Sequence, residues 1–204
     1  MNPSEAFLFP SSYYQDIAFF CSNYMTRIFS RGLIIFMFDE NDGWQGKLRS
    51  FIESILFKSH SDDSVAIGAM VLLEAFRNGP HPRPAYPHPD YLEYFLGAYI
   101  SAHHYLSRRP MRHGFWKDVV DDLYTECELQ RIEKTFASRL GGRVHIGQSG
   151  YLDMKKLMYG FVRTHMDLRS GGSYVRNRSS EPRDLPPWRM SNVGRRGTLT
   201  HTTS

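Results

Sequence analysis

Three consecutive segments with the spacing of α-helices lie between Tyr91 and Leu140, and they restrict the possible folds more than any other feature of the chain. Apolar side chains recur at steps of three and four residues in YLEYFLGAYISAHHYL (91–106), FWKDVVDDL (115–123) and ELQRIEKTFASRL (128–140). Thr125, followed three positions later by Glu128, has the sequence of a capping box at the start of the third segment. These segments predict an all-α fold of packed helices.

Two ionisable positions interrupt the apolar faces of these helices, His103–His104 in the first and Glu133 in the third. A buried ionisable group is costly unless it is paired, so such residues are paired inside the fold or face a partner molecule. For Glu133 the internal alternative is a pair with His104 or an arginine, and for His104 it is a hydrogen bond to a backbone carbonyl. A metal site at His103–His104 is not expected, because adjacent helical residues point about 100° apart.

Helical patterns also occur on both sides of this region. We expect helices at 11–30, 44–58 and 65–76, with Asp62 or Asp63 as the N-terminal cap of the last. The 65–76 segment is apolar nearly all round, which indicates a helix surrounded by others. Its small residues permit a close approach of neighbouring helices: Ala66, Gly68 and Ala69.

The pattern towards the end of the chain predicts a last helix within 143–162. Its apolar face is expected to consist of Leu152, Leu157, Tyr159 and Phe161. GLIIFMF (32–38) fits either a buried strand or a core helix. The segment 78–89 holds five of the eleven prolines and cannot be helical; it is either a loop between helices or a polyproline II ligand for a partner.

Positive charge is confined to the end of the chain. From Asp167 onward seven arginines stand against three carboxylates, an excess equal to the net charge of +4 of the whole chain. Residues 1–166 are therefore formally neutral, which argues against nucleic-acid or membrane binding by bulk charge. We expect an N-terminal helical extension (1–43), a helical box (44–165) and a basic, disordered C-terminal tail (166–204), where apolar periodicity ends.

The sequence contains no recognisable catalytic or metal-binding motif. Cys21 and Cys127 are far apart without CxxC spacing, and we expect both to be small core residues of an intracellular protein, cytoplasmic or nuclear. Asn23, Arg27 and Arg31 interrupt the apolar stretch Ile17–Phe38, which argues against a membrane span. No cofactor, small-molecule substrate or enzymatic activity is expected.

The central region resembles a cyclin box, the five-helix unit of cyclins. The similarity runs from about Leu48 to Phe161: VAIGAMVLLEAFR is similar to the second helix, FLGAYISAHHYLS to the third, and FWKDVVDDL, with Trp116, to the fourth. ELQRIEKTFASRL is similar to the Glu-Leu-x-x-Leu-Glu-x-x-Phe-Leu pattern of the fifth helix. The single box and the compact size look most like fungal cyclins of the phosphate-signalling group.

This resemblance implies that the chain binds a cyclin-dependent protein kinase and modulates its activity. In the family a lysine late in the third helix and a glutamate in the fifth contact the kinase, and His104 and Glu133 stand at these positions here. Arg108 replaces an acidic residue that often follows the third helix. The resemblance thus implies a partner-binding surface made of His104, Tyr105, Arg108 and Glu133.

Two other functions remain open at this point. One is a cyclin-fold adapter that binds a kinase without activating it, which histidine in place of lysine at 104 and alanine in place of leucine at 137 favour. The other is a nucleic-acid binder of the transcription-factor-IIB kind, against which the neutral charge of residues 1–166 argues.

Overall fold

The computed structural model describes residues 11–29, 43–79, 91–142 and 144–169. These residues form seven α-helices and no β-strand, which confirms the prediction of an all-α fold. All seven helices belong to the unit Met1–Gly171, whereas Gly172–Ser204 lies outside the described residues. The helices are α1 (Ser11–Phe29), α2 (Gly43–Ser59), α3 (Asp63–Asn78), α4 (Tyr91–Leu106), α5 (His113–Val119), α6 (Glu126–Arg139) and α7 (Gln148–Arg169).

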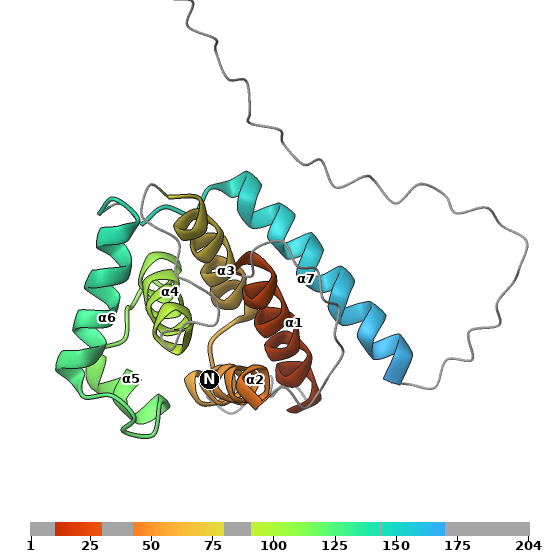
Figure 1. Ribbon diagram of the computed structural model, residues 1–204, viewed down its shortest axis with the longest axis horizontal. Coiled ribbons are helices and arrows are strands. Elements are labelled where there is room, and N and C mark those ends of the chain that lie inside the picture. The colour runs from red at the N-terminus through yellow and green to blue at the C-terminus, as the bar shows by residue number, and fades with distance from the viewer. Residues whose placement is uncertain (1–10, 30–42, 80–90, 143, 170–204) are drawn as a thin grey trace, which may run out of the picture. The chain divides into compact units, whose positions relative to one another are not determined.

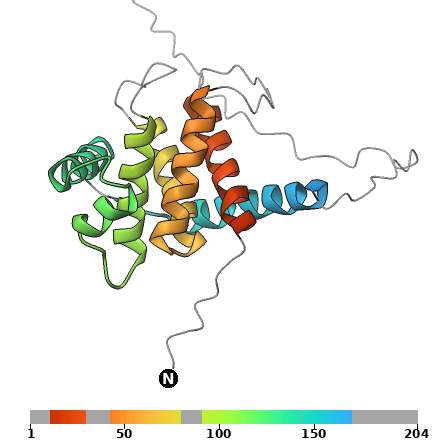
Figure 2. The ribbon, with the colours of Figure 1, turned by 90° about the horizontal axis from the view of Figure 1, so that it is seen from below.

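Helices α3 and α4 form the centre of the bundle. They pack against each other. Helix α3 also contacts α1 and α7, and helix α4 also contacts α2 and α6 (Figure 1). Figure 2 shows α7 running across the bundle, in a direction different from that of α1, α2 and α4. Helix α1, expected within an N-terminal extension, packs against α2, α3 and α7 and so forms part of the same core.

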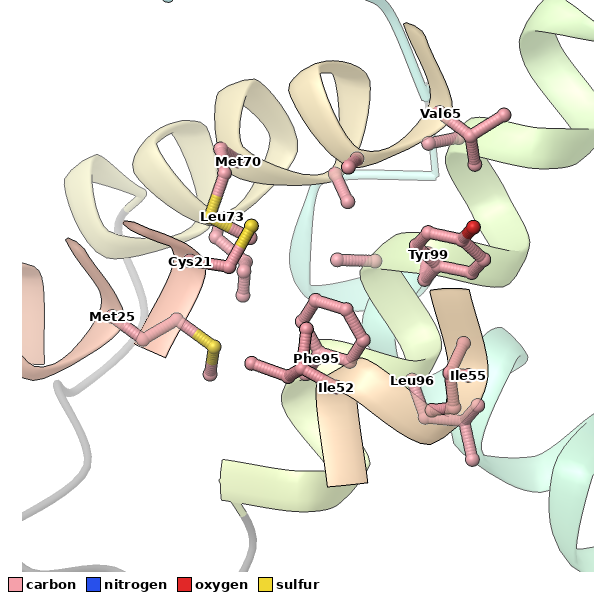
Figure 3. Close-up of a cluster of buried hydrophobic side chains, with 14 of the residues drawn as sticks. Cys21, Met25, Ile52, Ile55, Val65, Met70, Leu73, Phe95, Leu96 and Tyr99 are labelled. Atoms are coloured by element: carbon pink, nitrogen blue, oxygen red, sulfur yellow. The ribbon is translucent and has the colours of Figure 1, made fainter. Parts of the chain in front are cut away.

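Helices α1 to α4 contribute the side chains labelled in Figure 3, and α5, α6 and α7 add further buried residues to the same core. Cys21 and Met25 of α1, Ile52 of α2, Met70 of α3 and Phe95 of α4 are all buried. Burial of each large apolar side chain contributes about 1.5–3 kcal/mol, so this cluster is the main source of stability. Tyr99 of α4 is also fully buried, and its hydroxyl lies 3.0 Å from Ser59 Oγ, which gives this buried polar group a hydrogen-bond partner.

Two helices begin at the residues that local sequence rules predict. Asp62 is the N-cap of α3, where its Oδ1 accepts a hydrogen bond from Ser64 N at 3.1 Å. Thr125 and Glu128 form the complete capping box of α6, with Glu128 N donating to Thr125 Oγ1 and Thr125 N donating to Glu128 Oε2. Each of these caps satisfies amide groups that have no partner inside the helix.

Other expectations were wrong in detail. Helix α5 ends at Val119 rather than Leu123, because Asp121 and Asp122 adopt left-handed conformations with φ of 54° and 57°, which aspartate tolerates better than most residues. Cys21 is buried as expected, but Cys127 is exposed, because it lies on the face of α6 opposite the buried residues Leu129, Ile132 and Phe136.

The apolar face of α7 also differs from the expected one. Leu152 and Tyr159 are exposed, whereas Met154, Met158 and Val162 enter the core. Leu157 and Phe161 pack partly buried against it, as expected. The helix continues to Arg169, past the boundary expected at 166.

Three predictions fall on parts of the chain outside the described residues. They concern the 32–38 segment, nearly all of the 78–89 proline-rich segment, and disorder in the tail beyond Arg169. Within the described part of the chain, none of the helices combines the length and the apolar character needed to cross a membrane.

Candidate functional site

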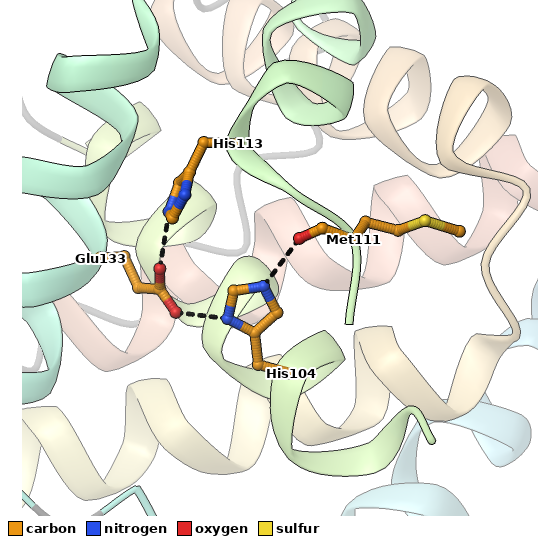
Figure 4. A network of polar contacts seen from close by, with 4 residues as sticks. All are labelled: His104, Met111, His113 and Glu133. Carbon is orange, nitrogen blue, oxygen red and sulfur yellow. Dashed lines mark hydrogen bonds and ion pairs between the residues drawn. The ribbon is translucent and has the colours of Figure 1, made fainter. Parts of the chain in front are cut away.

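Helices α4, α5 and α6 bring three ionisable side chains together at one end of the bundle (Figure 4). His104 lies in the last turn of α4, His113 is the first residue of α5, and Glu133 lies in the middle of α6. His104 Nδ1 is 2.6 Å from Glu133 Oε1, and His113 Nε2 is 2.8 Å from Glu133 Oε2. One carboxylate therefore joins three helices, and both of its oxygens are occupied.

The close packing of α4 on α6 makes this meeting possible. Gly97 of α4 faces Phe136 of α6, and a Cβ placed on the glycine would come within 2.8 Å of the Phe136 Cβ. No other residue fits such a separation without movement of the backbone. The small residue thus sets the distance at which His104 and Glu133, on the same two helices, form a direct hydrogen bond.

His104 has oxygen acceptors at both of its ring nitrogens. Nδ1 faces the Glu133 carboxylate, and Nε2 lies 3.0 Å from the backbone carbonyl oxygen of Met111. Only the doubly protonated imidazolium donates to both, so this geometry favours the cation. In agreement, the hydrogen bond to Glu133 raises the pKa of His104, and this outweighs the opposite effect of burial.

Glu133 is held as the carboxylate. Burial alone would raise its pKa, but the hydrogen bonds and the charges of His104 and His113 outweigh burial, and the net pKa lies below the usual value. Its side chain is 19% exposed and those of His104 and His113 are 26% and 21% exposed, so the network is partly shielded from water. The arrangement is an internal ion pair with a second histidine, which is one of the alternatives that the sequence left open.

The pKa of the adjacent His103 shifts in the opposite direction to that of His104. His103 is buried and packs edge-on against Trp116, with ring centroids 5.2 Å apart. Burial, together with the neighbouring His104, lowers the pKa of His103, so this ring is neutral. The described residues contain no cluster of three or more His, Cys, Asp or Glu side chains that could hold a metal ion.

The other two residues expected to bind a partner lie on the surface. Tyr105 is 46% exposed, and its hydroxyl lies 3.3 Å from His145 Nδ1 in the segment before α7. Arg108 is exposed in the α4–α5 loop, residues 107–112. The four expected residues therefore divide into an internal pair, His104 and Glu133, and two exposed side chains at the end of α4.

The same network fixes the α4–α5 loop at both of its ends. At the start of the loop, Ser107 N donates to the His103 carbonyl at 2.9 Å, which continues the helical hydrogen bonds of α4 by one residue. Near the end of the loop, His104 Nε2 forms a hydrogen bond with the carbonyl oxygen of Met111. The carbonyl of Arg112 then accepts hydrogen bonds from the first turn of α5, and His113 is tied to Glu133. His113 was not among the residues expected from the sequence, because it lies between the helical segments 91–106 and 115–123 and belongs to neither apolar pattern.

A second buried pair lies away from this site, between α1 and α7. Asp16 is 1% exposed, and its Oδ1 lies 2.8 Å from Nδ1 of His165. The His165 ring is stacked on Phe161 and lies against Phe19. This pair joins two packed helices.

In comparisons with known proteins, no family model, curated protein or solved structure matches this chain. The site itself provides a loop held by hydrogen bonds and, beside it, exposed side chains at the end of α4.

Proposed function

We propose that this chain is a cyclin-like regulatory subunit, which binds a cyclin-dependent protein kinase and modulates the activity of that kinase. The observation that carries the proposal is the direct pairing of His104 with Glu133 across the α4–α6 contact. These residues stand where the cyclin resemblance has a lysine and a glutamate. A histidine held as a cation by the carboxylate reproduces the positive charge of that lysine.

The regulatory action would consist of docking. The surface at the end of α4, with Tyr105 and Arg108 exposed, would hold the C-helix of the kinase in its inward position. That position completes the lysine–glutamate pair and the metal site that phosphoryl transfer requires. His104 and Glu133 would support this surface from inside, because their polar atoms are occupied by one another, His113 and Met111.

The test is purification of the tagged full-length chain from its native cells, followed by mass spectrometry and a kinase assay on the eluate. We expect a cyclin-dependent kinase whose activity depends on the chain. Arg108→Glu should reduce its recovery, whereas the matched control Arg163→Glu, at an exposed position of α7, should not. Absence of any kinase would contradict the proposal, whereas equal recovery with both variants would exclude Arg108 from the docking surface.

A second candidate is an adapter of the same fold that binds a kinase without activating it. The observation that favours it is that both carboxylate oxygens of Glu133 bind histidines inside the fold, His104 and His113, rather than facing a partner. Recovery of a kinase whose activity is the same with and without the chain would favour the adapter.

A further inference from the structure

The α4–α5 loop carries a concentration of positive charge without compensating acids. Arg108, Arg109 and Arg112 are all exposed, and residues 107–112 contain no carboxylate. None of the ion pairs among the described residues involves any of these three arginines. Arg112 is the N-cap residue of α5, but its side chain makes no capping hydrogen bond. Among the described residues, the three guanidinium groups therefore have no ion-pair partner, and they lie close together in a body, residues 1–166, whose formal charges sum to zero.

The same stretch of chain also exposes large apolar side chains. Tyr105, Leu106 and Met111 are 46%, 36% and 42% exposed, and they are three of the eight large exposed hydrophobic residues in the described part of the chain. A single exposed apolar side chain is common on protein surfaces. Residues 105–112 thus combine three exposed apolar side chains with three exposed arginines, and we call this stretch the 105–112 patch.

The backbone of the patch is held before any partner arrives. His104 binds the Met111 carbonyl, and the hydrogen bonds described above fix the start and the end of the loop. His104 is in turn held by Glu133, which also binds His113 at the start of α5. A loop whose backbone is already fixed loses less conformational entropy when it binds, so more of the interaction energy is retained.

We propose that the 105–112 patch binds an acidic segment of a partner protein, with an apolar side chain of that segment seated among Tyr105, Leu106 and Met111. The planar guanidinium groups suit carboxylates, because each presents paired donors to the two oxygens. This inference deepens the proposed function by naming the chemistry of the docking segment, and it rests on that function only for the identity of the partner.

Charge and size argue against other occupants. The tail of this chain carries seven arginines against three carboxylates from Asp167 onward, so like charges disfavour its binding to the patch. A specific DNA interface usually covers about 1,000–2,500 Å², far more than a loop of this length offers on a neutral body. Binding to anionic membranes usually requires clusters of about 4–8 basic residues, and the loop has only three.

The test measures binding of a fluorescent peptide, Glu-Glu-Leu-Glu-Glu, to the full-length chain by anisotropy. The variant Arg108→Ala/Arg109→Ala/Arg112→Ala should bind about 10-fold more weakly, because an exposed arginine–carboxylate pair contributes a factor of about two to three. The matched control removes the same charge from the tail through Arg189→Ala/Arg195→Ala/Arg196→Ala, and its affinity should change less than 2-fold. Circular dichroism verifies that both variants are folded.

Two further measurements separate the patch from general attraction between opposite charges. Met111→Ser, which keeps all the arginines, should weaken binding of this peptide about 3-fold and should leave binding of Glu-Glu-Ala-Glu-Glu unchanged. Equal losses from the loop and tail variants, equal binding of Gln-Gln-Leu-Gln-Gln, or equally effective competition by duplex DNA would each overturn the proposal.

The outcomes also distinguish this inference from the proposed function. Recovery of a kinase that is unaffected by the triple loop variant would refute the patch and leave the regulatory function standing. Specific peptide binding at the patch with no kinase recovered would support the patch and refute the kinase partner.

Discussion

Replacement of Glu133 by glutamine tests the central ionic network with the smallest possible change of shape. The amide keeps the size of the side chain but removes the charge and puts an N–H donor where one histidine donates. The two hydrogen bonds lost are short, at 2.6 and 2.8 Å, and both are made to a charged acceptor. Each such bond is worth about 1.5–3 kcal/mol in a shielded site.

The side chains of the network retain 19–26% exposure, so solvent reduces the expected cost to about 2–4 kcal/mol of unfolding free energy. For a chain of this size that corresponds to a fall in Tm of roughly 4–16 °C. The free energy of unfolding is best measured by urea denaturation followed by circular dichroism, at several pH values.

The loss of unfolding free energy caused by Glu133→Gln should depend on pH, and the directions of the two pKa shifts determine how. The pKa of His104 is raised above 6.5, so its stabilising contribution is complete below pH 6.5 and is lost as the pH rises through the folded-state pKa. The pKa of Glu133 is lowered below 4.5, so its contribution is present above pH 4.5 and is lost as the pH falls through the folded-state pKa. The cost of Glu133→Gln should therefore be largest between pH 4.5 and 6.5 and smaller at pH 9.

Glu126→Gln, at an exposed glutamate of the same helix, is the matched control. It should cost less than about 1 kcal/mol, because it removes only a charge near the N-terminus of α6. Equal costs for the two variants at pH 5.5, or a cost of Glu133→Gln that is the same at pH 5.5 and pH 9, would refute the assignment of an imidazolium to His104.

Two other substitutions test the packing and the capping on which the site depends. Gly97→Ala should destabilise the protein by about 1–3 kcal/mol, because its Cβ meets Phe136 Cβ at 2.8 Å. Gly46→Ala, whose Cβ meets nothing within 4 Å, should instead be stabilising by up to about 1 kcal/mol, and thermal melts in which both variants shift in the same direction would contradict this packing. Thr125→Ala should cost about 0.5–2 kcal/mol through loss of the capping box with Glu128, and an unchanged urea midpoint would show that the box is not formed.

Features that depend on a few neighbouring residues could be predicted from the sequence. The caps of α3 and α6 follow from side chains within three positions of the helix start: the capping box of α6 was predicted, and Asp62 is one of the two aspartates predicted as alternatives for α3. The all-α fold follows from apolar periodicity over most of the described chain. The juxtaposition of His104 and Glu133 was among the possibilities, because both interrupt apolar helix faces.

Features decided by distant neighbours could not be predicted in this way. Apolar residues occur on several sides of α7, and only the positions of α1 and α3 decide that Met154 and Met158 are buried while Leu152 and Tyr159 are exposed. The role of His113 depends on a carboxylate 20 positions away on a different helix, and no local spacing signals such a contact.

The contact between Asp16 and His165 also affects how the chain folds while the ribosome synthesises it. The two residues are 149 positions apart, so at about 5–20 residues per second a ribosome synthesises His165 roughly 7–30 s after Asp16. During that interval the apolar face of α1 has α2 and α3 as available partners but not α7. Helix α1 therefore completes its packing only after α7 has been synthesised, and until then the nascent chain depends on early pairing of α1 with α2 and α3 to keep that face from aggregating.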